Sequence, residues 1–146
     1  ERIIQKALNL KIDNVLFLPP QPFDKIPSLI SAADVCLVHL VKRNLYKITI
    51  PCKTYEYMAM GKPIIMAVKG DAESLVRDND CGIVVEPENS ESLKRAILAL
   101  YENPEEAERL GKNSRKASQR YSEEILLPKY KEVVYATLNN GGILNE

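Results

Sequence analysis

Four short apolar runs, separated by segments with helical spacing, constrain the fold of this chain more than any other feature. The runs lie at residues 15–18, 35–40, 63–68 and 82–85. Nearly every residue within them is apolar, whereas a strand with one solvated face would alternate apolar and polar residues. We therefore expect four strands that are covered on both faces, as the strands of a parallel sheet are.

The segments between the runs have the apolar spacing of helices and span residues 1–10, 24–33, 53–60, 72–77, 90–101, 104–119 and 122–138. Strands and helices thus alternate, which predicts an α/β fold with a Rossmann-like parallel sheet and helices on both sides. The first helix has no strand before it, and the chain does not begin with Met. We therefore expect a piece of a longer protein whose first strand or strands lie upstream.

The length of 146 residues is sufficient for one domain with a sizeable core. We assign residues 1–121 to a partial Rossmann-like domain. Residues 122–146 are expected to form the C-terminal helix of the same domain, followed by a tail that frays at residues 139–142.

Charge and cysteine content exclude several classes of function. Twenty basic residues balance twenty acidic ones, so no net charge attracts the chain to nucleic acid or to an anionic membrane. No apolar stretch approaches the length of about 18 residues that spans a bilayer. Three well-separated cysteines and one His are too few for a structural zinc site, and they predict reduced thiols in a cytoplasmic protein.

Ligands in open α/β sheets bind at the carboxyl ends of the strands, where loops lead into helices. The longest such loop follows the second apolar run, at residues 39–52, and it carries Lys42, Arg43 and Lys47. Loops of this length are uncommon unless they are functional or mobile. We therefore expect binding chemistry at this loop.

The residues after the loop could hold a phosphate beside a diol. Pro51 precedes a helix, so the first backbone N–H groups of that helix would be free to bind an anion. These groups belong to Cys52, Lys53 and Thr54, and the ammonium group of Lys53 adds a full charge. One turn further, Glu56 could accept hydrogen bonds from two vicinal hydroxyls. The pattern suits a nucleotide or a nucleotide sugar, although a first-turn Glu can also serve helix electrostatics alone and a Lys can simply be solvated.

Residues 51–65 read PCKTYEYMAMGKPII. This segment closely resembles the signature PSKxxEYMAxGKPVI of family 4 retaining glycosyltransferases. Weaker similarity to the same family, in the same order, extends over blocks at 14–18, 26–35, 73–76, 79–87 and 93–97. The similarity thus covers most of the chain, and the block from Lys53 to Pro63 is its specific part.

The resemblance implies an enzyme of the GT-B fold, in which two Rossmann-like domains enclose the active site. This chain is similar to the C-terminal, donor-binding domain. It would bind a nucleotide-diphosphate sugar, whose sugar is transferred with retention of configuration to a glycan or lipid-linked acceptor in polysaccharide biosynthesis. Cationic side chains and helix dipoles would stabilise the leaving diphosphate, so neither a cofactor nor a metal ion is implied.

The resemblance also implies roles for individual residues. Glu56 would hold the ribose hydroxyls of the donor, and the amides that face its diphosphate would be those of Cys52, Lys53 and Thr54. The nucleobase would lie against the backbone that follows the first apolar run, at Leu18, Pro19 and Pro20.

The chain departs from the family pattern at one position of the donor site. Many relatives have a second Glu eight positions before the one matching Glu56, and here that position is Ile48. Contacts to the donor sugar would then pass to Lys47 or Thr49. The family's cationic clamp on the diphosphate and its acceptor-binding domain would fall before residue 1. We therefore expect this chain alone to be inactive, and any association with the inner face of a membrane to come through the absent domain.

Three further residues lie on the ligand side of the expected sheet. His39 could act as a general base, but a packed or hydrogen-bonded residue at a strand end is the simpler interpretation. Asp71 and Glu73 open a helix from which they could reach the donor sugar, although capping of that helix explains Asp71 equally well.

The alternative function is a non-catalytic α/β module that binds a nucleotide or a partner.

Overall fold

The computed structural model describes residues 2–139 and has a parallel three-stranded sheet at its centre. The strands are β1 (Cys36–His39), β2 (Ile64–Ala67) and β3 (Gly82–Val84), and they lie side by side in chain order. Within the register, Ile64 of β2 lies opposite Cys36 on one side and Gly82 on the other. The expected parallel α/β sheet is confirmed for three of the four predicted strands.

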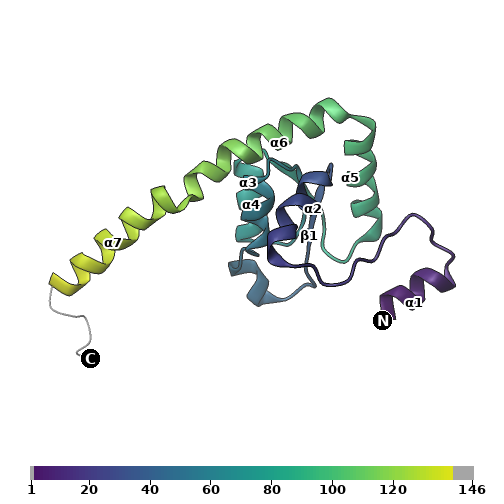
Figure 1. Ribbon diagram of the computed structural model, residues 1–146, viewed down its shortest axis with the longest axis horizontal. Coiled ribbons are helices and arrows are strands. Elements are labelled where there is room, and N and C mark those ends of the chain that lie inside the picture. The colour runs from purple at the N-terminus through teal and green to yellow at the C-terminus, as the bar shows by residue number, and fades with distance from the viewer. Residues whose placement is uncertain (1, 140–146) are drawn as a thin grey trace.

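Helices cover both faces of this sheet (Figure 1). The helices are α1 (Arg2–Asn9), α2 (Ile26–Ala32), α3 (Lys53–Ala59), α4 (Asp71–Asp78), α5 (Ser90–Glu102), α6 (Pro104–Ser118) and α7 (Glu123–Asn139). Three short 3₁₀ turns join them: η1 (Phe23–Lys25), η2 (Asn44–Ile48) and η3 (Gln119–Tyr121). Helix α3 connects β1 to β2, and α4 connects β2 to β3, as the alternating pattern predicted.

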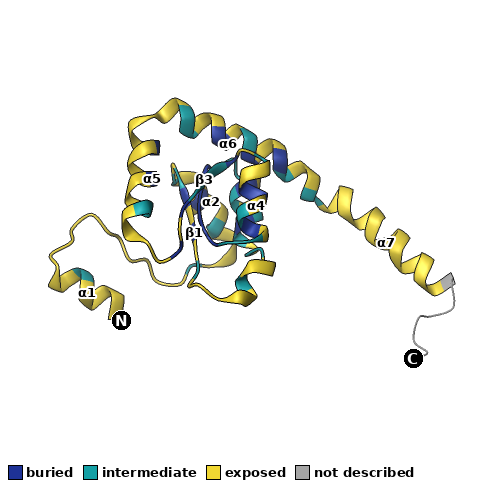
Figure 2. Cartoon of the chain, turned by 180° about the vertical axis from the view of Figure 1, so that it is seen from behind, coloured by how far each residue is buried: buried dark blue, intermediate teal, exposed yellow. Residues whose placement is uncertain are grey.

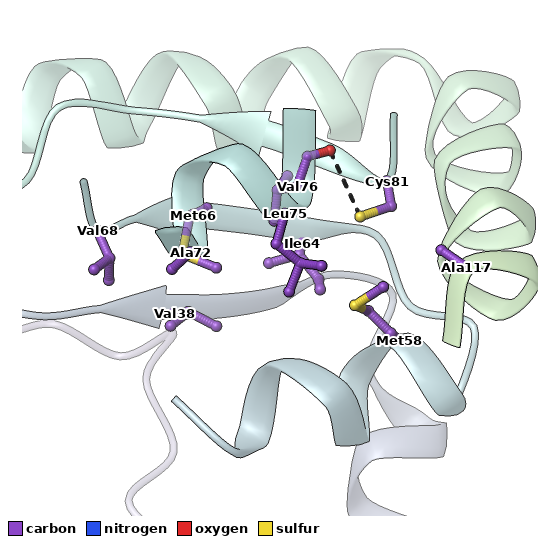
Figure 3. Packing of buried hydrophobic residues seen from close by; sticks show 10 residues of the cluster. All are labelled: Val38, Met58, Ile64, Met66, Val68, Ala72, Leu75, Val76, Cys81 and Ala117. Carbon is purple, nitrogen blue, oxygen red and sulfur yellow. Dashed lines mark hydrogen bonds between the residues drawn. The ribbon is translucent and has the colours of Figure 1, made fainter. Parts of the chain in front are cut away.

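The core lies in two layers, one on each face of the sheet. The first layer joins β1 and β2 to α3 and α4 and consists of Val38, Met58, Ile64, Met66, Val68, Ala72, Leu75, Val76, Cys81 and Ala117 (Figure 3). The second joins β2 to α5 and α6 and consists of Ile65, Ala67, Val85, Ala96, Leu100 and Leu110.

Strand β2 shows why its run is apolar at every position. Ile64 and Met66 pack in the first layer, and Ile65 and Ala67 pack in the second. None of these four side chains is more than 1% exposed. Full burial of a large apolar side chain contributes about 1.5–3 kcal/mol, so both faces of the strand stabilise the fold.

The prediction of a strand at residues 15–18 is wrong. The segment is irregular, and Leu16 is 81% exposed. A strand needs a neighbour that accepts and donates its backbone hydrogen bonds. Among residues 2–139, no backbone hydrogen bond joins this segment to the sheet, and β1 remains an edge strand.

The first and last helices lie apart from the two-layered core (Figure 2). Helix α1 has no buried residue, and α7 extends away from the end of α6. From residue 140 onward, the expected frayed tail lies outside the described residues.

Candidate functional site

The candidate site lies at the carboxyl-terminal edge of the sheet, where the loops after the three strands meet. We call this edge the rim. A hollow of about 600 Å³ opens there, and its charged lining residues are Lys42, Arg43, Lys47, Lys69 and Glu86. We call it the rim hollow. The predicted long loop after β1 supplies three of these side chains, so the structure places that loop at the ligand side of the sheet.

One carboxylate in the rim hollow binds two cations. The Nζ atom of Lys42 lies 2.8 Å from Oε1 of Glu86, and the Nζ atom of Lys69 lies 3.3 Å from Oε2 of the same side chain. These charge-assisted contacts lower the pKa of the Glu86 carboxyl from its ordinary value. The hydrogen bond to Glu86 in turn raises the pKa of Lys42. Each of the three loops of the rim contributes one member of this group.

A second contact ties the loop after β1 to the loop after β3. The backbone N–H of Lys42 donates to Oε2 of Glu88 over 2.9 Å. The N–H of Glu88 donates to Nε2 of His39 over 3.4 Å. His39 is thus an exposed strand-end residue whose Nε2 accepts a hydrogen bond, as in the simpler of the two interpretations. Its role as a general base stays a prediction.

Lys47 is held at the rim by its backbone. Gly70, just before α4, has a φ of +87°, and a Cβ atom there would lie 2.0 Å from the carbonyl oxygen of Lys47. Only Gly combines this conformation with such a close approach. The contact fixes η2 against the start of α4 and so fixes the position from which the Lys47 side chain enters the hollow.

Asp71 and Glu73 lie in the first turn of α4, beside this contact. Gly70 occupies the N-cap position, and Asp71 is the first helical residue and is exposed, so capping does not explain Asp71. Glu73 is engaged by Arg77, whose Nε donates over 3.0 Å, and its Oε1 lies 3.6 Å from Nζ of Lys69. The proposed contact of these carboxylates with a donor sugar stays a prediction.

The amides at the start of α3 differ from the prediction in one respect. The N–H of Thr54 donates to the carbonyl oxygen of Pro51 over 2.8 Å, so it is not free. The N–H groups of Cys52 and Lys53 have no hydrogen-bond partner among residues 2–139. Thr54 is fully buried, and its Oγ1 atom likewise lacks a partner in the described part of the chain. The free donors are therefore two amides, not three.

Glu56 lies in the first turn of α3 and is exposed, as the diol role requires. Within the described chain its carboxylate makes no hydrogen bond or ion pair. It lines a separate hollow of about 370 Å³ between α2, β1 and α3, beside Leu29 and Leu37. The structure thus places Glu56 and Lys47 in different hollows.

The remaining predicted contacts lie on exposed loops. Thr49 already uses its hydroxyl, since Oγ1 donates to the carbonyl oxygen of Leu45 over 2.9 Å. Ile48, at the position of the family's second Glu, is 75% exposed. The predicted nucleobase segment is exposed and irregular, and it comprises Leu18, Pro19 and Pro20.

Two charged residues of the rim hollow begin loops that the sequence places on the ligand side, but no role of its own was predicted for either residue. Lys69 and Glu86 come directly after the third and fourth apolar runs, a position that does place them at the rim. Their contact with Lys42 depends on the order of the strands, which the sequence pattern alone does not fix.

Other kinds of site find no support in the described residues. Between residues 2 and 139, no cluster of three or more His, Cys, Asp or Glu side chains is arranged to hold a metal ion. In the same range, no helix has the length and apolar composition needed to cross a membrane.

Comparison with known proteins identifies the family. Residues 1–117 match the sequence profile of the family described as "Glycosyl transferases group 1". The chain belongs to this family.

Two curated relatives show how much of such a protein the chain represents. It is 30% identical over 99 residues to a D-inositol 3-phosphate glycosyltransferase of Salinispora arenicola, a match that covers 67% of this chain and 21% of the relative. It is 28% identical over 139 residues to the enzyme of the same name from Saccharomonospora viridis, covering 92% of this chain and 31% of the relative. The chain therefore spans less than a third of the length of these relatives.

Solved structures confirm the GT-B glycosyltransferase fold class. Sucrose-phosphate synthase from Thermosynechococcus elongatus matches 96% of this chain and 34% of its own chain, with a TM-score of 0.84 and 25% identity. Anabaena HepE, solved in complex with UDP-glucose, matches 92% of this chain and 36% of its own, with a TM-score of 0.80 and 24% identity.

Proposed function

We propose that this chain binds the nucleotide-diphosphate sugar donor of a retaining glycosyltransferase. The observation that carries this proposal is the rim hollow, where four cationic side chains and one carboxylate line a cavity at the carboxyl end of a parallel sheet. Open α/β sheets bind their ligands at this edge. Membership of the glycosyl transferases group 1 family and the UDP-glucose complex of a protein with the same fold support a sugar nucleotide as the ligand.

Two cations of the rim hollow, which form no ion pair among residues 2–139, suit the diphosphate of such a donor. Lys47 is placed by the close contact with Gly70, and Arg43 lines the same cavity. The two free amides of Cys52 and Lys53 supply further donors at the start of α3. Positive groups beside the leaving diphosphate would stabilise the negative charge that develops on it during transfer. We assign charge stabilisation to these groups and infer that this chain contributes it without a metal ion.

Glu56 would bind the ribose of the donor, and the donor would then have to reach from the rim hollow to the separate hollow that Glu56 lines. Its carboxylate is exposed and has no partner among residues 2–139, so both oxygens can accept hydrogen bonds from vicinal hydroxyls. The rest of the reaction lies with the parts of the protein beyond this chain. These would bind a glycan or lipid-linked acceptor, and its hydroxyl would attack the same face of the sugar that the diphosphate leaves, which retains the configuration.

Titration of the chain with UDP, GDP and ADP, followed by NMR shifts or calorimetry, tests the proposal. We expect at least one diphosphate to bind at millimolar concentration or below, and Lys47→Gln to weaken it. Lys112→Gln is the matched control, because Lys112 is an exposed lysine of α6 that pairs with Glu108. Absence of binding for all three nucleotides, or equal effects of the two substitutions, would contradict the proposal.

A further inference from the structure

We propose that Glu86 is a built-in counter-ion of the donor site. In the absence of donor it holds the ammonium groups of Lys42 and Lys69, and the diphosphate of the donor displaces it and takes both cations. The inference rests on the proposed donor-binding function. It adds Lys42 and Lys69 to the groups that bind the diphosphate, and it gives Glu86 a role that opposes binding.

The geometry places two cations on one carboxylate at the point where three loops meet. Lys42 follows β1, Lys69 follows β2 and Glu86 follows β3. The two Nζ atoms approach different oxygens of Glu86, at 2.8 Å and 3.3 Å. The two ammonium groups repel each other, and the carboxylate between them offsets that repulsion.

These ion pairs can exchange with a ligand because they face solvent. The side chains of Lys42, Lys69 and Glu86 are 54%, 39% and 44% exposed. Exposed ion pairs are weak, because water and salt screen them. An anion with more charge than a single carboxylate therefore competes for the same two cations.

The surroundings favour the exchange. Arg43 and Lys47 line the same hollow, and neither forms an ion pair within residues 2–139. Glu86 thus offers one negative charge to a cavity lined by four cations. A diphosphate carries more than one negative charge and would compensate the cavity more completely.

The backbone of the site does not depend on Glu86. The N–H of Lys42 is held by Glu88 over 2.9 Å, and Lys69 also lies 3.6 Å from Glu73. When Glu86 is displaced, its two partners therefore keep other anchors. Movement of side chains is sufficient for the exchange.

A different role for the same contacts predicts the opposite effect. If Glu86 instead orders the loop after β1 for binding, its removal would weaken donor binding. The sign of the change in donor affinity on removing the Glu86 charge therefore distinguishes a displaced counter-ion from a residue that orders the loop.

The experiment is calorimetric titration of the chain at low ionic strength with UDP, GDP, ADP and inorganic pyrophosphate. We expect Glu86→Gln to tighten binding by about two- to fivefold, the range in which a weak exposed ion pair changes an affinity. Lys42→Gln and Lys69→Gln should each weaken binding by a similar factor. An unchanged or weaker affinity of Glu86→Gln would overturn this inference and leave donor binding intact. No binding of any of the four ligands to the unsubstituted chain would overturn the proposed function itself, and the inference with it.

Two controls separate exchange from general repulsion of an anion. Glu88→Gln removes a charge from the same rim but from a side chain that holds a backbone N–H, so its effect should be smaller. In the Lys42→Gln, Lys69→Gln double variant, Glu86→Gln should no longer tighten binding, because the cations it would release are gone. A gain in affinity that persists in this background, or that Glu88→Gln reproduces in full, would overturn the inference.

Discussion

The carbonyl oxygen of Lys47 occupies the space in which a side chain on Gly70 would have to begin. A Cβ atom on Gly70 would lie 2.0 Å from that oxygen and 2.6 Å from the carbonyl carbon. Both contacts are with backbone, which has little freedom to move aside. The start of α4 and the 3₁₀ turn that carries Lys47 are therefore packed directly against each other, and the position of the Lys47 backbone at the rim depends on a residue without a side chain.

Gly70→Ala should destabilise the chain and also weaken nucleotide binding. The positive φ alone costs a non-glycine residue about 1–3 kcal/mol, and here the clash with Lys47 adds to that strain. Gly61→Ala is the matched control, since Gly61 has a φ of +67° but its Cβ would meet no atom closer than 3.6 Å. Urea denaturation should show a larger loss for Gly70→Ala than for Gly61→Ala, with a loss of UDP affinity only for the former. Equal losses for the two variants would show that the contact with Lys47 is unimportant.

Much of the fold was predictable because a strand that is buried on both faces is apolar at nearly every position. A short stretch of sequence is enough to show this pattern. The run that became β2 is apolar at every position, as both of its faces lie in the core. The run at 15–18 is equally apolar but is not a strand, because strand formation depends on a neighbouring chain segment that local composition does not reveal. Local pattern thus identified where strands can form, and pairing decided which ones do.

The sequence predicted which loops lie at the rim, but it did not predict which side chains contact one another there. The rule that ligands bind at strand carboxyl ends predicted that the loop carrying Lys42 and Lys47 lies at the rim, and the structure has it there. The ion pairs of Glu86 could not be foreseen, since they join loops that are distant in sequence and become neighbours only through the strand order. The amide N–H of Thr54 was expected to be free, but in the tight turn at Pro51 it donates to the carbonyl oxygen of Pro51.

Glu56→Ala should weaken binding of a nucleoside diphosphate by about 1–3 kcal/mol, the usual cost of losing a charged hydrogen bond. Its effect on the free energy of unfolding should be small, because the side chain is exposed and has no partner among the described residues. Glu105→Ala is a suitable control, since Glu105 is an exposed first-turn carboxylate of α6. Calorimetry with UDP and with the corresponding 2′,3′-dideoxy nucleotide would test the diol role. An equal effect of Glu56→Ala on both ligands would contradict it.

Ser114→Ala should destabilise the fold without affecting the site. The buried hydroxyl of Ser114 bridges the carbonyl oxygens of Lys62 and Cys81, at 2.8 Å and 3.2 Å, and so ties α6 to the residues before β2 and β3. Removing a buried donor leaves these acceptors without it and costs about 1–3 kcal/mol. Ser118→Ala removes a hydroxyl that bonds only within its own helix and should cost less. Urea denaturation measures the free energy of unfolding of both variants. A loss for Ser118→Ala as large as that for Ser114→Ala would contradict the bridging role.

The stability that Arg109 contributes should depend on pH. Its guanidinium binds Asp80 and Glu106, and these contacts hold the pKa values of both carboxyls below their ordinary values of 3.8 and 4.5. A lowered pKa in the folded state means that the contribution is complete above the ordinary values and is lost as the pH falls through the lowered ones. The stability difference between the unsubstituted chain and Arg109→Gln should therefore be constant from pH 7 to about 5 and shrink steadily toward pH 2.

Arg95→Gln, which removes an exposed arginine of α5 with no ion pair among residues 2–139, should show no such decline. Thermal melts of the three proteins across this range would check the prediction, and a difference for Arg109→Gln that persists unchanged at pH 2 would contradict it.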